Sequence, residues 1–307
     1  MYPVTTESLF TLDGLSDHRR HRINRITAVL GAPLSPDTRG YALAHHLLEG
    51  AEQAARAEHD GLLTWYRTAS HDQLGHLAEG DHLILTANPE NRLRSSLSDT
   101  EYYLITPNSA PAPQDVRNLV RAALASATQH GFGPLLGEHA PIICLLDHRG
   151  LYDTLHSWTL SRLPGTVYTD YTDHPETLAR DLIHEAAHNW LNDALALHEI
   201  KLPDDVTYYS PWRAMHRPVY GFLHACWAFS LASLYSKQAL ATAPQPAASA
   251  LEAFLEQQLH HLDAAHQHVD AAAASLPSTE LRARIREATV RARALLNGSA
   301  RTPNLGE

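Results

Sequence analysis

Cysteine is scarce in this 307-residue chain, and long hydrophobic runs and clusters of basic residues are absent. The two cysteines, Cys144 and Cys226, lie in apolar segments, which predicts buried free thiols in a reducing cytoplasm. The most apolar stretch, residues 221–235, is interrupted by polar side chains and is too short to cross a bilayer. The start of the sequence has no basic patch followed by an apolar run, so no secretory signal is expected. We therefore expect a cytoplasmic protein without a membrane partner.

The balance of charge is acidic, with 24 lysines and arginines against 34 acidic residues and a formal net charge of −10. Because no basic stripe is present to neutralise phosphates, nucleic acid is not an expected partner. A small substrate of either sign stays open, since an acidic protein can still contain a local positive pocket. The hydrophobic share of 44% and the charged share of 19% are ordinary for a globular enzyme.

Helical patterns dominate the sequence, and β-like runs are few and short. Helices are predicted over residues 17–30, 36–60, 114–129, 176–197, 218–240, 247–274 and 278–296. Strands are predicted over residues 102–106, 142–146 and 167–171. The fold class expected is mainly α (α+β), with a few short strands, and not a cupin barrel. Residues 1–240 are predicted to form a metal-binding catalytic domain, and residues 241–307 a C-terminal helical hairpin packed on the same domain.

The helix over residues 176–197 carries the sequence His184-Glu185-Ala186-Ala187-His188. Residues four apart on a helix share one face, so the imidazoles of His184 and His188 can reach one cation, with Glu185 beside them. Apolar residues around the motif place it on a buried, metalloprotease-like helical core. The chain has 22 histidines, so a chance occurrence on a core or surface helix is the competing interpretation.

A third ligand is needed to complete such a site. In metzincin peptidases the His-Glu-x-x-His motif continues with a glycine and a third histidine, at the positions where this chain has Leu191 and Ala194. The metzincin class of peptidases is therefore excluded. Glu199 follows too closely to serve as the downstream glutamate of a thermolysin-like peptidase. His224 lies at the centre of the next apolar helix, where an unpaired imidazole would be costly to bury. We therefore predict His224 as the third ligand, against the alternative of a core histidine satisfied by its neighbours.

Two arginines, Arg213 and Arg217, precede the His224 helix in the segments Ser210-Pro211-Trp212-Arg213 and Arg217-Pro218. Pro218 suits a first helical position, which puts Arg217 at or near the N-cap. Arg217 and His224 are then about two turns apart on nearly the same face, roughly 10 Å along the axis. A diacid that chelates the metal at one end could meet the guanidinium at the other. An arginine that only caps the helix or forms a salt bridge is the alternative.

The stretch from about residue 163 to residue 235 resembles the HExxH-type, 2-oxoglutarate-dependent peptide β-hydroxylases found with ribosomally made, modified peptides. The resemblance rests on the following ordered motifs: Pro164-Gly165-Thr166-Val167-Tyr168, Leu182-Ile183-His184-Glu185-Ala186-Ala187-His188, Ser210-Pro211-Trp212-Arg213, Arg217-Pro218 and Gly221-Phe222-Leu223-His224. The chain departs from the pattern at residues 214–216 and at Ala225.

The resemblance implies Fe(II) held by His184, His188 and His224, with 2-oxoglutarate as cosubstrate. Arg217 or Arg213 would hold the distal carboxylate of that cosubstrate, and Glu185 would orient its neighbours. The implied reaction uses O2 to hydroxylate an unactivated C–H bond, at a side-chain β-carbon, of a peptide or an amino-acid-derived natural product. Imidazole ligands suit iron and zinc alike, so the ligands alone do not choose the metal.

Two other functions stay open at this point. In a zinc-dependent peptidase, Glu185 would activate a metal-bound water for amide hydrolysis. In a non-catalytic helical scaffold, the motif would have no chemical role. The sequence names neither the substrate nor the oligomeric state. It also gives no pattern that would place Trp190, Trp212, Tyr168 or Trp227 in a pocket, and these aromatic residues are expected in the core.

Overall fold

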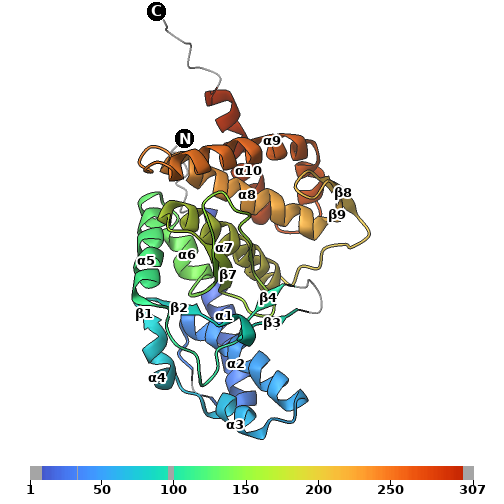
Figure 1. Cartoon of the computed structure of the whole chain (residues 1–307). Coiled ribbons are helices and arrows are strands. Elements are labelled where there is room, and N and C mark those ends of the chain that lie inside the picture. Colours follow the sequence, from blue (N-terminus) through green and yellow to red (C-terminus); the bar gives the residue numbers. More distant parts are fainter. Residues whose placement is uncertain (1–8, 33, 96–99, 300–307) are drawn as a thin grey trace, which may run out of the picture.

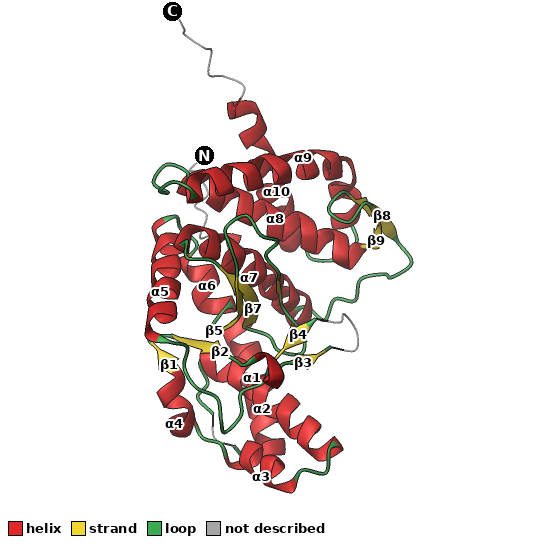
Figure 2. Cartoon of the chain, in the orientation of Figure 1, coloured by secondary structure: helices red, strands yellow, loops and turns green. Residues whose placement is uncertain are grey.

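The computed structural model describes residues 9–32, 34–95 and 100–299, which form a mainly α fold with a few short strands. Figures 1 and 2 show the five-stranded sheet in the middle of the molecule, with helices above and below it, and the β8–β9 pair at the upper right. In the described part of the chain, the strands form one open five-stranded sheet and two short two-stranded sheets, and none closes into a barrel. The predicted fold class is therefore confirmed.

The principal helices are α1 (Leu15–Leu30), α2 (Thr38–Arg56), α3 (Asp60–Thr68), α4 (His71–Leu74), α5 (Gln114–Gln129), α6 (Gly133–His139), α7 (Pro175–Leu197), α8 (Val219–Ala239), α9 (Ala247–Ala273) and α10 (Thr279–Ser299). The strands are β1 (Ala78–Glu79), β2 (His82–Thr86), β3 (Leu93–Arg94), β4 (Glu101–Tyr102), β5 (Ile142–His148), β6 (Ser157–Trp158), β7 (Thr166–Tyr171), β8 (Thr207–Ser210) and β9 (Met215–Pro218). Short 3₁₀ turns at Gly75–Leu77 and Pro89–Asn91 complete the list. The strands predicted at 142–146 and 167–171 are present as β5 and β7. Of the strand predicted at 102–106, only the two-residue strand β4 is found, at Glu101–Tyr102.

The five-stranded sheet has the order β1-β2-β5-β7-β6, with β2, β5 and β7 parallel and both edge strands antiparallel. Successive side chains of a strand point to opposite faces. Accordingly, Ile143 and Val167 pack with the residues of α7 on one face. Cys144 and Tyr168 pack with the residues of α2 on the other face. Because both faces are covered, β5 is a continuous apolar run rather than an alternating one.

The C-terminal helices extend the core on the side of α7. Helix α8 contacts α7, α9 and α10, which explains why it is apolar on all sides. Buried residues of α9 and α10 belong to the same hydrophobic cluster as those of α7 and α8. Helices α9 and α10 also contact each other, and the predicted division into a catalytic domain and a C-terminal hairpin at residue 240 stays a prediction.

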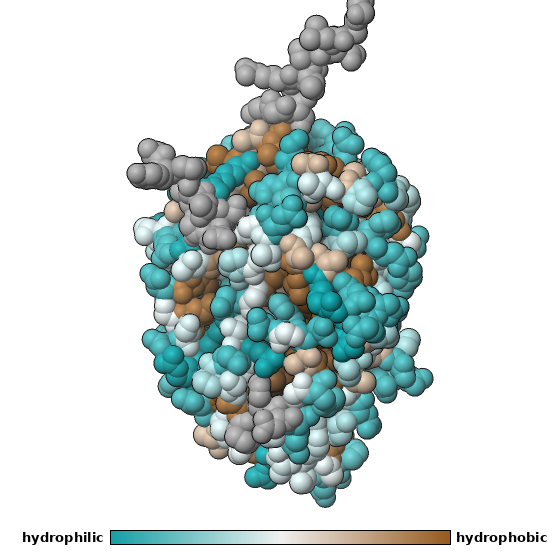
Figure 3. Space-filling view, turned by 90° about the vertical axis from the view of Figure 1, so that its left-hand side faces the viewer, coloured by the Kyte–Doolittle hydropathy of each residue, from teal (hydrophilic) through white to brown (hydrophobic). Residues whose placement is uncertain are grey.

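The outer surface of the molecule is mainly polar on the face drawn in Figure 3, where brown apolar residues occur in separate patches among teal ones. Within the described ranges, every helix is too short or too polar to cross a membrane. Both cysteines are free and buried, as predicted.

Candidate metal centre

Helix α7 holds the His-Glu-x-x-His motif on a rigid element. Pro175 occupies its first turn, where backbone N–H groups make no hydrogen bonds within the helix, so the N–H that proline lacks is not needed. Trp190 is fully buried behind the motif. The Asn189 side-chain amide donates to the backbone oxygens of His139, at 2.8 Å, and Thr166, at 3.2 Å. These contacts tie the back of α7 to α6 and β7, and so fix the direction of the opposite face.

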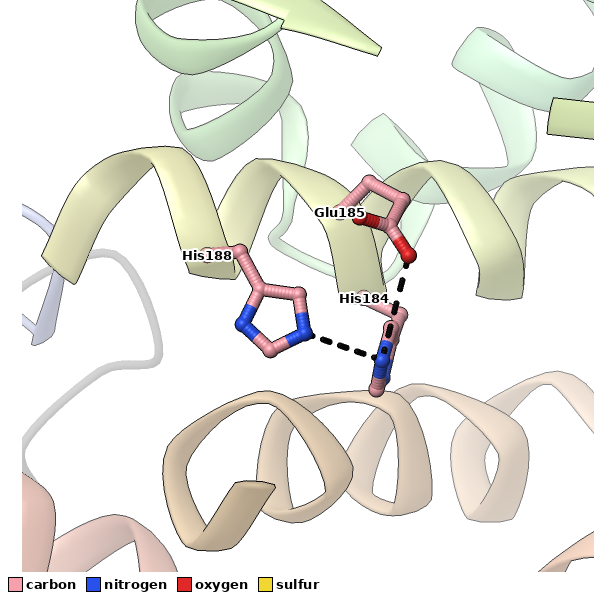
Figure 4. A group of neighbouring side chains, drawn as sticks. All are labelled: His184, Glu185 and His188. Atoms are coloured by element: carbon pink, nitrogen blue, oxygen red, sulfur yellow. Dashed lines mark hydrogen bonds and ion pairs between the residues drawn. The ribbon is translucent and has the colours of Figure 1, made fainter. Parts of the chain in front are cut away.

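His184 and His188 project from that opposite face toward α8, as Figure 4 shows. Their Nε2 atoms lie 3.2 Å apart. Two imidazole nitrogens bonded to one cation at about 2.0–2.1 Å would lie roughly 2.9–3.4 Å apart for ligand angles between 90° and tetrahedral. The pair therefore already has the nitrogen spacing that a shared cation requires.

His224 reaches the same cluster from α8. Its Nδ1 lies 3.0 Å from Nδ1 of His188, and the two ring centroids are 5.2 Å apart. His188 thus faces His184 through Nε2 and His224 through Nδ1, so the three rings form a chain of contacts rather than three nitrogens around one point. The possible ligand atoms that all lie within 4.8 Å of one another belong to His184, Glu185 and His188. The ring of His224 does not point away from the pair, but its role as the third ligand stays a prediction.

Glu185 lies between the His184 ring and Ser157 of strand β6. The Ser157 hydroxyl donates to its Oε1 at 2.7 Å, and the same oxygen lies 3.9 Å from Nε2 of His184. Burial raises the pKa of Glu185 to about 8, against the opposing effect of the Ser157 hydrogen bond. The side chain is therefore mainly a neutral acid at neutral pH. Its second oxygen, Oε2, is buried without a hydrogen-bond partner in the described structure.

The electrostatics of the cluster keep its imidazoles neutral. Burial, assisted by the charge of Arg217, lowers the pKa of His188 to about 4. Burial and the neighbouring rings also bring the pKa values of His184 and His224 well below the ordinary value. A neutral imidazole has a free lone pair, so all three rings are ready to bind a cation at neutral pH. Nε2 of His224 is buried and has no hydrogen-bond partner among the described residues.

Arg217 lies in strand β9, directly before the N-cap of the following helix, so it is near the N-cap as predicted, whereas the prediction of Pro218 as the first helical residue is wrong. The N-cap is Pro218, whose ψ of 154° is extended, and α8 begins at Val219. The guanidinium lies over the first turn of α8. It packs so closely against Gly221 that a Cβ atom on this residue would stand only 2.8 Å from Cζ of Arg217. Burial, with the nearby charge of Arg213, lowers the pKa of Arg217.

Both predicted arginines share a cavity of about 700 Å³ with the three histidines. Arg217 is half-buried and Arg213 is exposed. Neither guanidinium has a hydrogen bond or ion pair with any described residue, whereas Arg162, also in this cavity, pairs with Glu49. Since Glu185 is the cavity's sole carboxylate among the described residues and is mainly neutral, the cavity is electropositive inside a protein of net charge −10.

An aromatic stack that the sequence did not predict supports the cluster. The Trp212 ring lies parallel to Phe229, with centroids 5.0 Å apart, and Phe229 contacts the His184 ring at 4.4 Å. The Trp212 indole N–H donates to Oε1 of Gln258 in α9, at 2.9 Å. Trp212 therefore lines the cavity, contrary to the expected core position, while Trp190, Trp227 and Tyr168 are fully buried as expected.

Sequence reasoning also missed Ser157 and Gln258. Ser157 lies in a two-residue strand, and Gln258 is one polar residue of a long helix, so neither belongs to a recognisable motif. Only the pattern Ser-Pro-Trp-Arg carried a signal, and it pointed to Arg213 rather than to Trp212.

No protein-family model and no curated protein matches this chain. The resemblance to HExxH-type peptide β-hydroxylases consequently depends on the motifs of the sequence alone, and stays a prediction.

Proposed function

We propose that the protein is an Fe(II)- and 2-oxoglutarate-dependent oxygenase that hydroxylates an unactivated C–H bond of a peptide or an amino-acid-derived natural product. One observation carries the proposal: the unpaired, half-buried guanidinium of Arg217 lies in the same cavity as His184, His188 and His224. A cosubstrate with two carboxylates could meet a cation at one end and this guanidinium at the other.

The histidine cluster fits a divalent cation. The three imidazoles are neutral, the Nε2 atoms of His184 and His188 have the spacing of two ligands, and His224 adjoins them. The orphaned Nε2 of His224 supports this reading, because a buried unsatisfied polar group costs about 1–3 kcal/mol. Histidine ligands suit iron and zinc equally, so the choice of iron depends on the arginine beside them and on the motif resemblance.

In the proposed reaction, a substrate C–H bond, one O2 and one 2-oxoglutarate give an alcohol, succinate and carbon dioxide. Iron bound at the cluster would supply the activation of O2. The residues of the chain do the rest: the imidazoles of His184, His188 and His224 hold the cation, and Arg217 holds the distal carboxylate. Glu185, kept beside His184 by the Ser157 hydroxyl, orients its neighbour and is not required as a base.

A zinc-dependent peptidase is the second candidate. It is favoured by the position of Glu185, whose Oε1 lies 3.9 Å from Nε2 of His184, beside the pair that would hold zinc. A raised pKa near 8 is also within the range that suits proton transfer. The peptidase, however, gives no role to the unpaired guanidinium groups of Arg213 and Arg217.

The decisive experiment measures metal content and succinate formation on anaerobically purified protein supplied with Fe(II), ascorbate and 2-oxoglutarate. We expect succinate that depends on O2 and iron, and its loss in His184→Ala but not in His266→Ala, an exposed histidine of α9. Arg217→Met should raise the KM for 2-oxoglutarate about tenfold or more, because a charge-assisted contact is lost, whereas the exposed Arg25→Met should not.

Two outcomes contradict the oxygenase. Stoichiometric zinc with oxygen-independent cleavage of a peptide would support the peptidase instead. Wild-type protein that binds no metal and forms no succinate, with His184→Ala indistinguishable from it, would leave only the non-catalytic scaffold.

A further inference from the structure

The cavity of the metal centre lies beside a second and larger one. The larger chamber has a volume of about 1080 Å³ and extends toward strands β3, β4 and β5. The two chambers share a wall that includes Ser157, His184, Arg213 and Phe229. His184 therefore borders both chambers, while His188, His224 and Arg217 border only the smaller one. A substrate in the larger chamber would reach the cation from the side of His184.

The arginines of the larger chamber differ in how they are paired. Arg92 pairs with Glu101 and Asp147, and Arg94 with Glu101. Arg149 pairs with Asp147 and Asp170, and Arg180 with Asp181. The remaining carboxylate of the chamber, Asp153, accepts a hydrogen bond from the backbone N–H of Gly150. Within the described residues, Arg213 is thus the one arginine of this chamber that has no carboxylate partner.

The backbone around Arg213 is held in place. Its N–H donates to the oxygen of Ser210 at 3.2 Å, closing the turn between β8 and β9. The preceding residue, Trp212, is fixed by the indole hydrogen bond to Gln258 and by the stack on Phe229. A positive charge is therefore presented at the junction of the chambers from an ordered segment, next to the second unpaired guanidinium of Arg217.

We propose that the two arginines divide their ligands: Arg217 binds the distal carboxylate of the cosubstrate, and Arg213 binds a carboxylate of the substrate in the larger chamber. The substrate class is then an acidic peptide, or an amino-acid derivative with a free carboxylate, whose reacting carbon lies toward His184. This assignment rests on the proposed function, because it takes the smaller chamber as the cosubstrate site.

The assignment follows from position and exposure. Arg217 is half-buried and borders only the smaller chamber, which it shares with His184, His188 and His224, so its charge lies in the same cavity as the predicted metal ligands. Arg213 is exposed and borders both chambers, so an anion arriving through the larger chamber meets it before it meets Arg217. A guanidinium that is planar and permanently charged suits bidentate contact with a carboxylate.

The test uses the full chain loaded with Ni(II), which binds imidazole, in the absence of 2-oxoglutarate. The probe is an equimolar pool of capped tripeptides, acetyl-Ala-X-Ala-amide, with X each of the twenty amino acids. Retention by the protein in ultrafiltration is measured by mass spectrometry for the wild type, Arg213→Met, Arg217→Met and the control Arg25→Met. Melting temperatures of the variants establish that each one is folded.

We expect the aspartate and glutamate peptides to be retained about tenfold more than their asparagine and glutamine counterparts. Arg213→Met should abolish this preference, and Arg217→Met and Arg25→Met should keep it. Equal retention of acidic and amide peptides by the wild type, no retention of any peptide, or loss of the preference in Arg217→Met alone would overturn the assignment.

Failure of the proposed function is seen separately. It would appear as a wild-type, metal-loaded protein that does not bind 2-oxoglutarate in isothermal titration, whatever the tripeptides do. If the wild type binds 2-oxoglutarate, Arg217→Met should weaken that binding about tenfold, and Arg213→Met should change it less than threefold.

Discussion

The affinity of the histidine cluster for a divalent cation should change little as the pH falls from about 7.5 to about 5.5. Metal and proton compete for the same imidazole nitrogens, so the pKa of each ligand sets the pH at which the metal is lost. At this site, burial lowers the pKa values of all three predicted ligands, His184, His188 and His224. The proton is therefore a weak competitor over this range.

The size of the effect follows from these pKa values. A histidine with the ordinary pKa of 6.5 is roughly 90% protonated at about pH 5.5, which weakens metal binding about tenfold per ligand and about a thousandfold for three. His188, with a pKa of about 4, is only roughly 3% protonated at that pH. We expect a total loss of affinity below about tenfold for the cluster.

The same shift has a stability consequence in the metal-free protein. Below the ordinary pKa of 6.5 the unfolded chain takes up a proton at His188, whereas the folded chain does so only near pH 4. The unfolded state thus binds more protons in this window, and the folded protein loses stability as the pH falls through it. The contribution of His188 is about 3 kcal/mol at most.

The assay is equilibrium dialysis of Co(II) against the wild type and His188→Ala at a series of pH values, with His266→Ala as the matched control. The wild type and the control should keep a nearly constant affinity, and His188→Ala should bind far more weakly at every pH. A thousandfold loss of wild-type affinity with a midpoint near the ordinary histidine pKa would refute the reasoning, since the ligands would then be solvated and not buried.

Three further predictions concern the surroundings of the site. The pKa of Glu185 in the folded protein, about 8, exceeds its ordinary value of 4.5, so the folded state binds the extra proton and metal-free stability should fall as the pH rises between these values. Glu185→Gln should remove this slope, measured as melting temperature in chelator near pH 6 and pH 8.5. Asp193→Asn should destabilise the protein by about 3 kcal/mol in urea unfolding, because Asp193 and Arg19, 2.8 Å apart, are both buried; a change under about 0.5 kcal/mol would show that the pair is not needed. Gln258→Leu should cost about 1–3 kcal/mol by leaving the Trp212 indole N–H without its acceptor, and an unchanged unfolding midpoint would contradict the hydrogen bond.

The sequence predicted the helices of the site well, since their signals are local. The helix expected at 176–197 is α7, Pro175–Leu197, and the one expected at 218–240 is α8, Val219–Ala239. The four-residue spacing of His184 and His188 settles that they share a face once the helix is known. That His224 lies against His188 could be anticipated only from the cost of burying an unpaired imidazole.

Features that depend on distant pairing escaped the sequence. Strand β2, which pairs with β5, is a five-residue segment without a clear period, and its place in the sheet is set by partners about sixty residues away. The Ser157 contact with Glu185 joins residues 28 apart through a two-residue strand. Pro218 was expected as the first helical residue, with Arg217 at or near the N-cap; Arg217 does lie next to the N-cap, but the pairing of β8 with β9 keeps Pro218 extended and outside the helix.

The most direct test of the central claim is an anaerobic crystal structure of the Fe(II)-loaded protein. The account predicts one iron bound by nitrogen atoms of His184, His188 and His224, with the Glu185 carboxyl group still hydrogen-bonded to Ser157 and away from the iron. Iron held by His184, His188 and the Glu185 carboxylate, with the ring of His224 unbound, or no iron in this cavity at all, would contradict it.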